Sequence, residues 1–115
     1  MITIYHNPNC GTSTKALALL NEKGIHPTVR DVVEDPLSSE ELFHLLDLLG
    51  MDAMDLVRTN HPVWIAEFSS LELDEEEEIV LALIDNPGMM QRPIVVKDGR
   101  AILARPSEKV LEILA

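Results

Sequence analysis

The first 33 residues alternate between strand-like and helix-like apolar patterns, and this order constrains the fold more than any other feature. Residues 2–5 form a short apolar run rich in β-branched side chains, which favours a strand. Helical spacing follows, from a cap at Thr12 or Ser13 up to Gly24, which is suited to end a helix. Residues 27–33 favour a second strand. This order predicts a βαβ unit with parallel strands and a right-handed crossover.

Helices rather than strands are expected in the middle of the chain, at about 37–90. Ser38 and Glu41 have the spacing of a capping box, and the strongly apolar helix that follows should stop at Gly50. Another helix is expected to begin at Asp74, where acidic residues suit the positive end of the helix dipole. Shorter helical segments are expected at 52–57 and 64–68.

The end of the chain predicts a hairpin followed by a last helix. Strands are expected at 93–96 and 101–104, and a helix is expected at 107–114. Asp98-Gly99 lies between the two strands and is a strong hairpin signal. Pro106 should open the helix, because proline is favoured at the first helical position. The residues expected to face inward from this helix are Val110, Leu111 and Leu114.

Without the helical block, the predicted elements follow the order βαβ and then ββα, which is the thioredoxin-like arrangement. A chain of 115 residues with 46% hydrophobic residues can build one core without disulfides or metal. We therefore predict an α/β, thioredoxin-like fold in one domain, residues 1–115. Its helical insertion, at about 37–90, lies between the βαβ unit and the C-terminal ββα unit.

Charge and cysteine content exclude several classes of protein. A net charge of −11 argues against binding nucleic acid through its phosphates and disfavours an anionic membrane surface. The single cysteine makes an internal disulfide impossible and favours a reducing compartment, so we expect a cytoplasmic protein. Residues 1–6 do not have the pattern of a signal peptide, and no apolar run approaches the ~20 residues of a membrane span.

The single cysteine, Cys10, lies in a polar turn between the first strand and the first helix. A lone cysteine is often only a small buried apolar residue, but this context favours a nucleophile. The N–H groups of Gly11, Thr12 and Ser13 would stabilise a thiolate and could also bind an oxyanion. The Ser13 hydroxyl can reach the sulfur, and His6, if protonated, would favour the thiolate further. His6 could equally be a solvated residue at the strand end.

Three arginines stand at predicted element boundaries: Arg58, Arg92 and Arg105. Each one alone is typical of a solvated residue or a helix-end charge. Together they could bring three planar guanidinium groups to one oxyanion. The remaining histidines, His26, His44 and His61, have no metal-ligand spacing, so we expect no metal site.

Segments 5–13, 86–96 and 105–111 resemble, in this order, the glutaredoxin-dependent arsenate reductase family, ArsC-type, which is related to the Spx family. The resemblance implies that Cys10 attacks arsenate and that His6 and Ser13 tune or hold its thiolate. It assigns oxyanion binding to the amides of Gly11, Thr12 and Ser13 and to the guanidinium groups of Arg58, Arg92 and Arg105. By analogy with thioredoxin-like folds, Pro93 would be a cis proline beside the active site.

The resemblance also implies the reaction and its partners. The Cys10 thiolate would form an adduct with arsenate, glutathione would attack the adduct, and glutaredoxin would remove the glutathione so that arsenite leaves. This route to arsenic detoxification needs glutathione as a co-substrate and no bound cofactor. A single cysteine suits it, because the other thiols come from outside. The sequence departs from the family pattern at Thr14-Lys15, where an arginine is common.

Two other functions stay open at this point. An Spx-type transcription regulator would share the fold and bind RNA polymerase, although Ser13 stands where such proteins often carry the second cysteine of a redox switch. A monothiol oxidoreductase acting on glutathione mixed disulfides would also need only one cysteine. The conjunction of His6 with the three arginines favours an enzyme that uses an anion.

Overall fold

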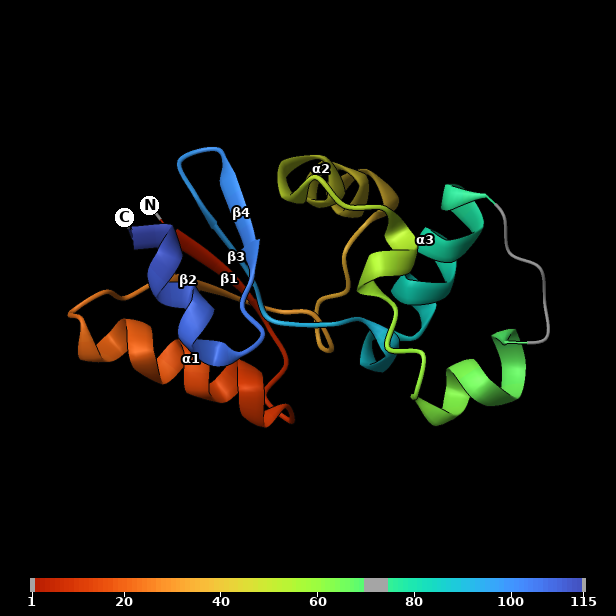
Figure 1. The fold of residues 1–115 in the computed structure, drawn as a ribbon, viewed down its shortest axis with the longest axis horizontal. Helices are drawn as coiled ribbons and strands as arrows, with labels where there is room; N and C mark the ends of the chain where they lie inside the picture. The colour runs from red at the N-terminus through yellow and green to blue at the C-terminus, as the bar shows by residue number, and fades with distance from the viewer. Residues whose placement is uncertain (1, 70–74, 115) are drawn as a thin grey trace. The chain divides into compact units, whose positions relative to one another are not determined.

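The computed structural model describes residues 2–69 and 75–114, which divide into two units (Figure 1). The first unit comprises the described residues of Met1–Asp35 and Arg92–Ala115. The second unit comprises the described residues of Pro36–Gln91. The single-domain organisation stays a prediction.

A four-stranded mixed sheet forms the frame of the first unit, with strand order β2-β1-β3-β4. Its strands are β1 (Ile2–His6), β2 (Thr28–Asp31), β3 (Ile94–Lys97) and β4 (Arg100–Leu103). The helix α1 (Gly11–Glu22) joins β1 to β2, which are parallel, while β1–β3 and β3–β4 are antiparallel. The βαβ unit and the α/β, thioredoxin-like arrangement predicted from the sequence are therefore confirmed.

The hairpin between β3 and β4 follows from two residues with positive φ. Asp98 has a φ of 50° and Gly99 a φ of 77°, while Lys97 pairs with Arg100 across the turn. Positive φ at both central positions is typical of a type I′ turn, whose twist matches that of the flanking strands. The Asp98-Gly99 signal therefore predicted the hairpin correctly.

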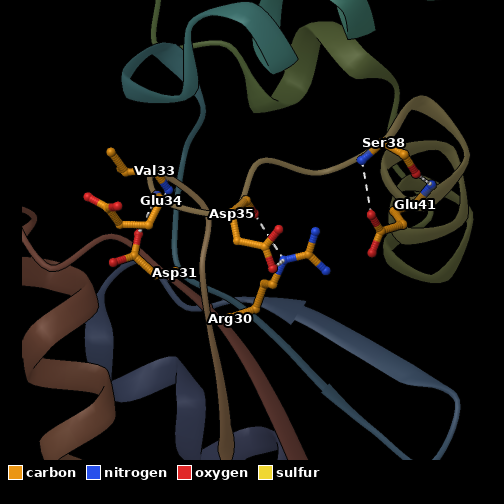
Figure 2. Close-up of polar contacts among 7 residues, drawn as sticks. All are labelled: Arg30, Asp31, Val33, Glu34, Asp35, Ser38 and Glu41. Atoms are coloured by element: carbon orange, nitrogen blue, oxygen red, sulfur yellow. Dashed lines mark hydrogen bonds and ion pairs between the residues drawn. The ribbon is translucent and has the colours of Figure 1, made fainter.

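The strand β2 ends two residues earlier than its apolar pattern indicates. The Asp31 carboxylate accepts hydrogen bonds from the N–H groups of Val33, at 2.9 Å, and Glu34, at 3.1 Å (Figure 2). This local turn competes with the sheet for the backbone donors. The guanidinium of Arg30 then holds the turn, because its Nε donates to the Asp35 carbonyl at 2.9 Å and lies 2.8 Å from the Asp35 carboxylate.

The last helix, η4 (Ser107–Leu114), packs with α1 and with β3 and β4 (Figure 1). It is a 3₁₀ helix, so residues three apart share one face. Its buried residues are Ser107, Val110 and Ile113. The expectation from α-helical spacing was therefore right for Val110. It missed Ile113, while Leu111 and Leu114 do pack against the core but are only partly buried.

The core of the first unit is aliphatic and lies between the sheet and these two helices. Its buried members are Ile2, Ile4, Ala16, Leu20, Val95, Ala104, Val110 and Ile113. Gly24, with a φ of 77°, ends α1 as expected, and the Ile25 N–H bonds back to the Leu20 carbonyl at 3.0 Å. This core therefore holds α1 against the sheet, and with it Cys10, the residue that precedes α1.

The second unit is helical in its described part, as predicted. Its elements are α2 (Ser39–Leu49), η1 (Ala53–Leu56), η2 (Trp64–Phe68), α3 (Glu76–Asp85) and η3 (Pro87–Met89). The helix α3 packs against α2, η1 and η3. Asp74, the expected start of α3, lies outside the described residues, and Glu75 is the residue that precedes this helix. No helix in residues 2–69 and 75–114 is long and apolar enough to cross a membrane.

The capping box at the start of α2 leads to a prediction about stability. The Ser38 hydroxyl accepts from the Glu41 N–H at 3.2 Å, and the Glu41 carboxylate accepts from the Ser38 N–H at 3.0 Å (Figure 2). We expect Ser38→Ala to lower the free energy of unfolding by about 1 kcal/mol, because it removes the cap of the helix. Urea denaturation measures this loss. Ser39→Ala, one residue later and inside the helix, is the matched control and should show little change.

Candidate active site

Cys10 is the N-cap residue of α1 and is partly exposed. The helix therefore begins at Gly11, and the sequence-based assignment of the cap to Thr12 or Ser13 was wrong. The Ser13 side chain does not serve as the cap because its hydroxyl is bonded outside the helix. As a result, Gly11, Thr12 and Ser13 form the first helical turn, where backbone N–H groups have no partner within the helix.

The surroundings of Cys10 favour its thiolate. Burial by itself raises the pKa of the thiol, but the backbone N–H of Ser13, the guanidinium of Arg92 and the backbone N–H of Thr12 outweigh it and hold the pKa below its ordinary value. Among the described residues no side-chain capping hydrogen bond joins Cys10 to the helix, and these N–H groups act on the thiol from the first helical turn by lowering its pKa. Such an anion-stabilising site is typical of a reactive cysteine.

The Ser13 hydroxyl belongs to a buried polar cluster with His6 and Asn7. It lies 2.5 Å from His6 Nδ1 and accepts the Asn7 N–H at 3.2 Å. The hydroxyl can both donate and accept, so it bonds to Asn7 and to His6 at the same time, and the tautomer of the imidazole sets which atom donates between Ser13 and His6. Ser13 therefore acts on Cys10 through its backbone N–H, whereas its hydroxyl orders the turn.

His6 is buried and favours its neutral form. Burial lowers the pKa of its imidazole below the ordinary 6.5, although the charge of Asp31, its neighbour on β2, opposes this by raising the pKa. Near neutral pH the imidazole is therefore uncharged. The condition set from the sequence, a protonated His6 beside the thiolate, is therefore disfavoured there, and the hydrogen bond that the structure shows for its imidazole is to the Ser13 hydroxyl.

The lowered pKa of His6 predicts how stability depends on pH. Below the ordinary value of 6.5 the unfolded chain binds a proton at His6 that the folded chain resists, so the free energy of unfolding should fall as pH falls. His6→Gln should reduce the stability difference between pH 7.5 and pH 5.5, measured by urea denaturation. His26→Gln, at an exposed histidine, should keep the wild-type difference. Equal pH dependence in the wild type and His6→Gln would contradict the assignment.

Asn7 is a structural residue of the site that the sequence did not single out. It is 4% exposed, its carbonyl accepts the Cys10 N–H at 3.0 Å, and its side-chain oxygen accepts the Asn9 N–H at 2.8 Å. These bonds form the turn that places Cys10 after β1. The signal that could have identified it is Asn7-Pro8, because asparagine before proline favours turns closed by its own side chain.

One of the three predicted arginines, Arg92, lies beside Cys10, and a second, Arg105, is hydrogen-bonded to the backbone of Arg92. Arg92 is 6% exposed and hydrogen-bonds to the Cys10 sulfur through its side chain. Arg105 is partly buried, and its Nη1 donates to the Arg92 carbonyl at 3.1 Å. Each arginine precedes a proline in a cis peptide bond, at Pro93 as expected and also at Pro106. The structure therefore places a buried guanidinium directly beside the nucleophile.

Arg58 belongs to the second unit, where its backbone and side chain bind the turn of η3. Its N–H donates to the Met89 carbonyl at 2.7 Å, and its Nη1 donates to the Gly88 carbonyl at 3.1 Å. These bonds fix Arg58 within its own unit. Its convergence with Cys10 stays a prediction.

The chemistry available at Cys10 is nucleophilic attack on an anion. In residues 2–69 and 75–114 no group of three histidine, cysteine or acidic side chains could hold a metal ion. What the described site combines is a thiol of lowered pKa, a buried guanidinium and amide donors at a helix start. Gly11 has nothing within 4 Å of the position of a Cβ, so a ligand can approach the backbone there. This arrangement can bind an oxyanion and present sulfur to it.

Comparisons with known proteins cover nearly the whole chain. Residues 5–113 match the family model described as ArsC family. The chain is 42% identical to Uncharacterized protein YfgD of Escherichia coli (strain K12), over 98% of this chain and 96% of that one. It is 38% identical to an Arsenate reductase of Escherichia coli, over 98% of this chain and 80% of the relative. A solved structure, Arsenate reductase from Vibrio cholerae, is similar with a TM-score of 0.90 at 35% identity, over 97% and 96% of the two chains.

Proposed function

This chain belongs to the ArsC family, and we propose that it reduces arsenate to arsenite with glutathione and glutaredoxin as electron donors. The observation that carries the proposal is the position of Cys10 at the start of α1, where the Arg92 guanidinium and two backbone amides favour its thiolate. A thiolate held next to a buried cation suits a substrate that is both an anion and an electrophile.

Arsenate is bound in this proposal by groups that neutralise its negative oxygens. Arg92 and Arg105 supply guanidinium groups in the first unit, and Arg58 is proposed to supply a third. The backbone amides of the first turn of α1 are the neutral donors. Because charge grows on the oxygens during attack, donors already in position stabilise the transition state more than the bound substrate.

The first chemical step forms a bond between sulfur and arsenic. The Cys10 thiolate attacks arsenic(V), and one oxygen leaves as water after taking up a proton, so no electrons are transferred to arsenic. Glutathione then adds its sulfur to arsenic and a second water leaves. The adduct now carries the Cys10 sulfur and the glutathione sulfur on the same arsenic(V).

Reduction takes place when glutaredoxin attacks. Its thiolate forms a disulfide with the glutathione sulfur, the arsenic–sulfur bond breaks, and that electron pair stays on arsenic, which becomes arsenic(III). Water then displaces the Cys10 thiolate and arsenite leaves. The two electrons come from one glutathione and one glutaredoxin thiol, which supports a chain with only one cysteine of its own.

A coupled assay tests the proposed function. Purified protein is mixed with arsenate, glutathione, glutaredoxin, glutathione reductase and NADPH, and one NADPH should be oxidised for each arsenite formed. Omitting either arsenate or glutaredoxin should stop the reaction. Absence of arsenate-dependent turnover would overturn the proposal. Binding of RNA polymerase would then favour the regulator, and reduction of a glutathione mixed disulfide without arsenate would favour the monothiol oxidoreductase.

A further inference from the structure

A buried serine outside the predicted site joins η4 to the start of α1. Ser107 is 4% exposed, and its hydroxyl donates to the Thr12 carbonyl at 2.8 Å, across 95 residues of sequence. Buried hydroxyls in a mostly aliphatic core are kept only where they have a partner, because an unsatisfied one is costly. Here the partner lies two residues after the nucleophile.

The peptide group that receives this hydrogen bond is the same one that faces Cys10. The Thr12 carbonyl and the Ser13 N–H belong to a single amide, and this N–H is one of the groups that lower the pKa of the Cys10 thiol. A donor placed on the carbonyl of an amide polarises it and makes its N–H a stronger donor, because hydrogen bonds in a chain reinforce one another. The Ser107 hydroxyl is thus one amide away from the reactive sulfur.

A second path connects Ser107 to the same sulfur. Ser107 follows Arg105 by two residues, Arg105 donates to the Arg92 carbonyl, and the Arg92 side chain bonds to Cys10. One path therefore runs from Ser107 to Cys10 through the Thr12–Ser13 amide, and the other runs through the two arginines. The contact between Ser107 and Thr12 therefore joins the start of η4, close in sequence to Arg105, to the first turn of α1.

We propose that Ser107 is a positioning residue of the Cys10 site, whose hydroxyl polarises the Thr12–Ser13 amide and holds it against the sulfur. It touches neither substrate nor sulfur itself, and it acts through the groups that do. The inference deepens the proposed function and rests on Cys10 being its nucleophile.

The chain provides a matched control at the same contact between helices. Lys15 Nζ lies 2.5 Å from the Glu108 carboxylate, and both side chains are exposed, at 60% and 53%. This ion pair also joins α1 to η4, but it is exposed, and exposed pairs contribute little to stability. If the contact between α1 and η4 only stabilised the fold, replacing Lys15 or Ser107 should have the same kind of effect. An effect on the pKa of the Cys10 thiol is expected only when Ser107 is replaced.

The test is the pH dependence of Cys10 alkylation by iodoacetamide in the wild type, Ser107→Ala and Lys15→Met. Ser107→Ala should raise the midpoint pH by about half a unit, which is roughly a threefold lower thiolate fraction at pH values well below the midpoint. Lys15→Met should leave the midpoint unchanged. The same midpoint in Ser107→Ala and the wild type would overturn the inference.

A second pair of variants separates the hydroxyl from packing if Ser107→Ala fails to fold. Ser107→Thr and Ser107→Val have nearly the same shape, and only threonine keeps the donor. The midpoint should be lower in Ser107→Thr than in Ser107→Val, and equal midpoints would overturn the inference. Alkylation needs no arsenate, so a protein without arsenate turnover would disprove the proposed function while this measurement still decides the role of Ser107.

Discussion

Replacing Cys10 by serine is expected to abolish arsenate-dependent NADPH oxidation, a loss on the order of 10⁴-fold or more. A serine hydroxyl stays protonated near neutral pH, and its oxygen does not form an adduct from which a second thiol can remove arsenic. The coupled assay measures the loss directly. Mass spectrometry of the wild type, quenched during turnover, should in addition show arsenic bound to the peptide that contains Cys10.

The same substitution should leave the fold intact, which separates chemistry from stability. Cys10 is the N-cap of α1, and serine is among the residues most favoured at that position. The Cys10→Ser variant should therefore still unfold in one cooperative transition on heating. Ser39→Ala, far in sequence from the site, should retain full turnover. Measurable arsenate reduction by Cys10→Ser would disprove the assignment of the nucleophile.

Replacing Arg92 by methionine is expected to lower kcat/KM for arsenate by about 100-fold, the usual cost of removing one donor to a developing oxyanion. The same change should raise the pKa of the Cys10 thiol, because Arg92 both hydrogen-bonds to the sulfur and acts on it by its charge. Methionine is a suitable replacement since it fills the buried site of Arg92 without leaving an unpaired charge. Steady-state kinetics and pH-dependent alkylation measure the two effects.

Two further variants separate charge from shape in this prediction. Arg92→Lys restores the charge but not the planar fork, so the thiol pKa should recover more than kcat/KM does. Arg100→Met, at an exposed arginine in the β3–β4 hairpin, is the matched control and should change neither quantity. If Arg92→Met kept the wild-type thiol pKa, the contact between guanidinium and sulfur would have no electrostatic role.

Much of the fold could be predicted because its signals are local. The capping box at Ser38, the Asp98-Gly99 turn and the βαβ order each depend on bonds or patterns within a few residues, and each is present in the structure. The prediction of the buried residues failed in the last helix, which is a 3₁₀ helix and not an α-helix. In η4 the 3₁₀ spacing buries Ile113, which an α-helical spacing does not place inward.

For the site, the sequence by itself determined the position of Cys10 between a strand and a helix start, and therefore its access to backbone donors. Only the tertiary structure decided what surrounds that sulfur. Burial lowers the pKa of His6, Asn7 and His6 bond to the Ser13 hydroxyl, and Arg92 comes from a distant segment of the chain. The physical reason is distance along the chain, since a turn or cap is set by neighbours, whereas contacts such as Ser107 with Thr12, 95 residues apart, exist only once the core has packed.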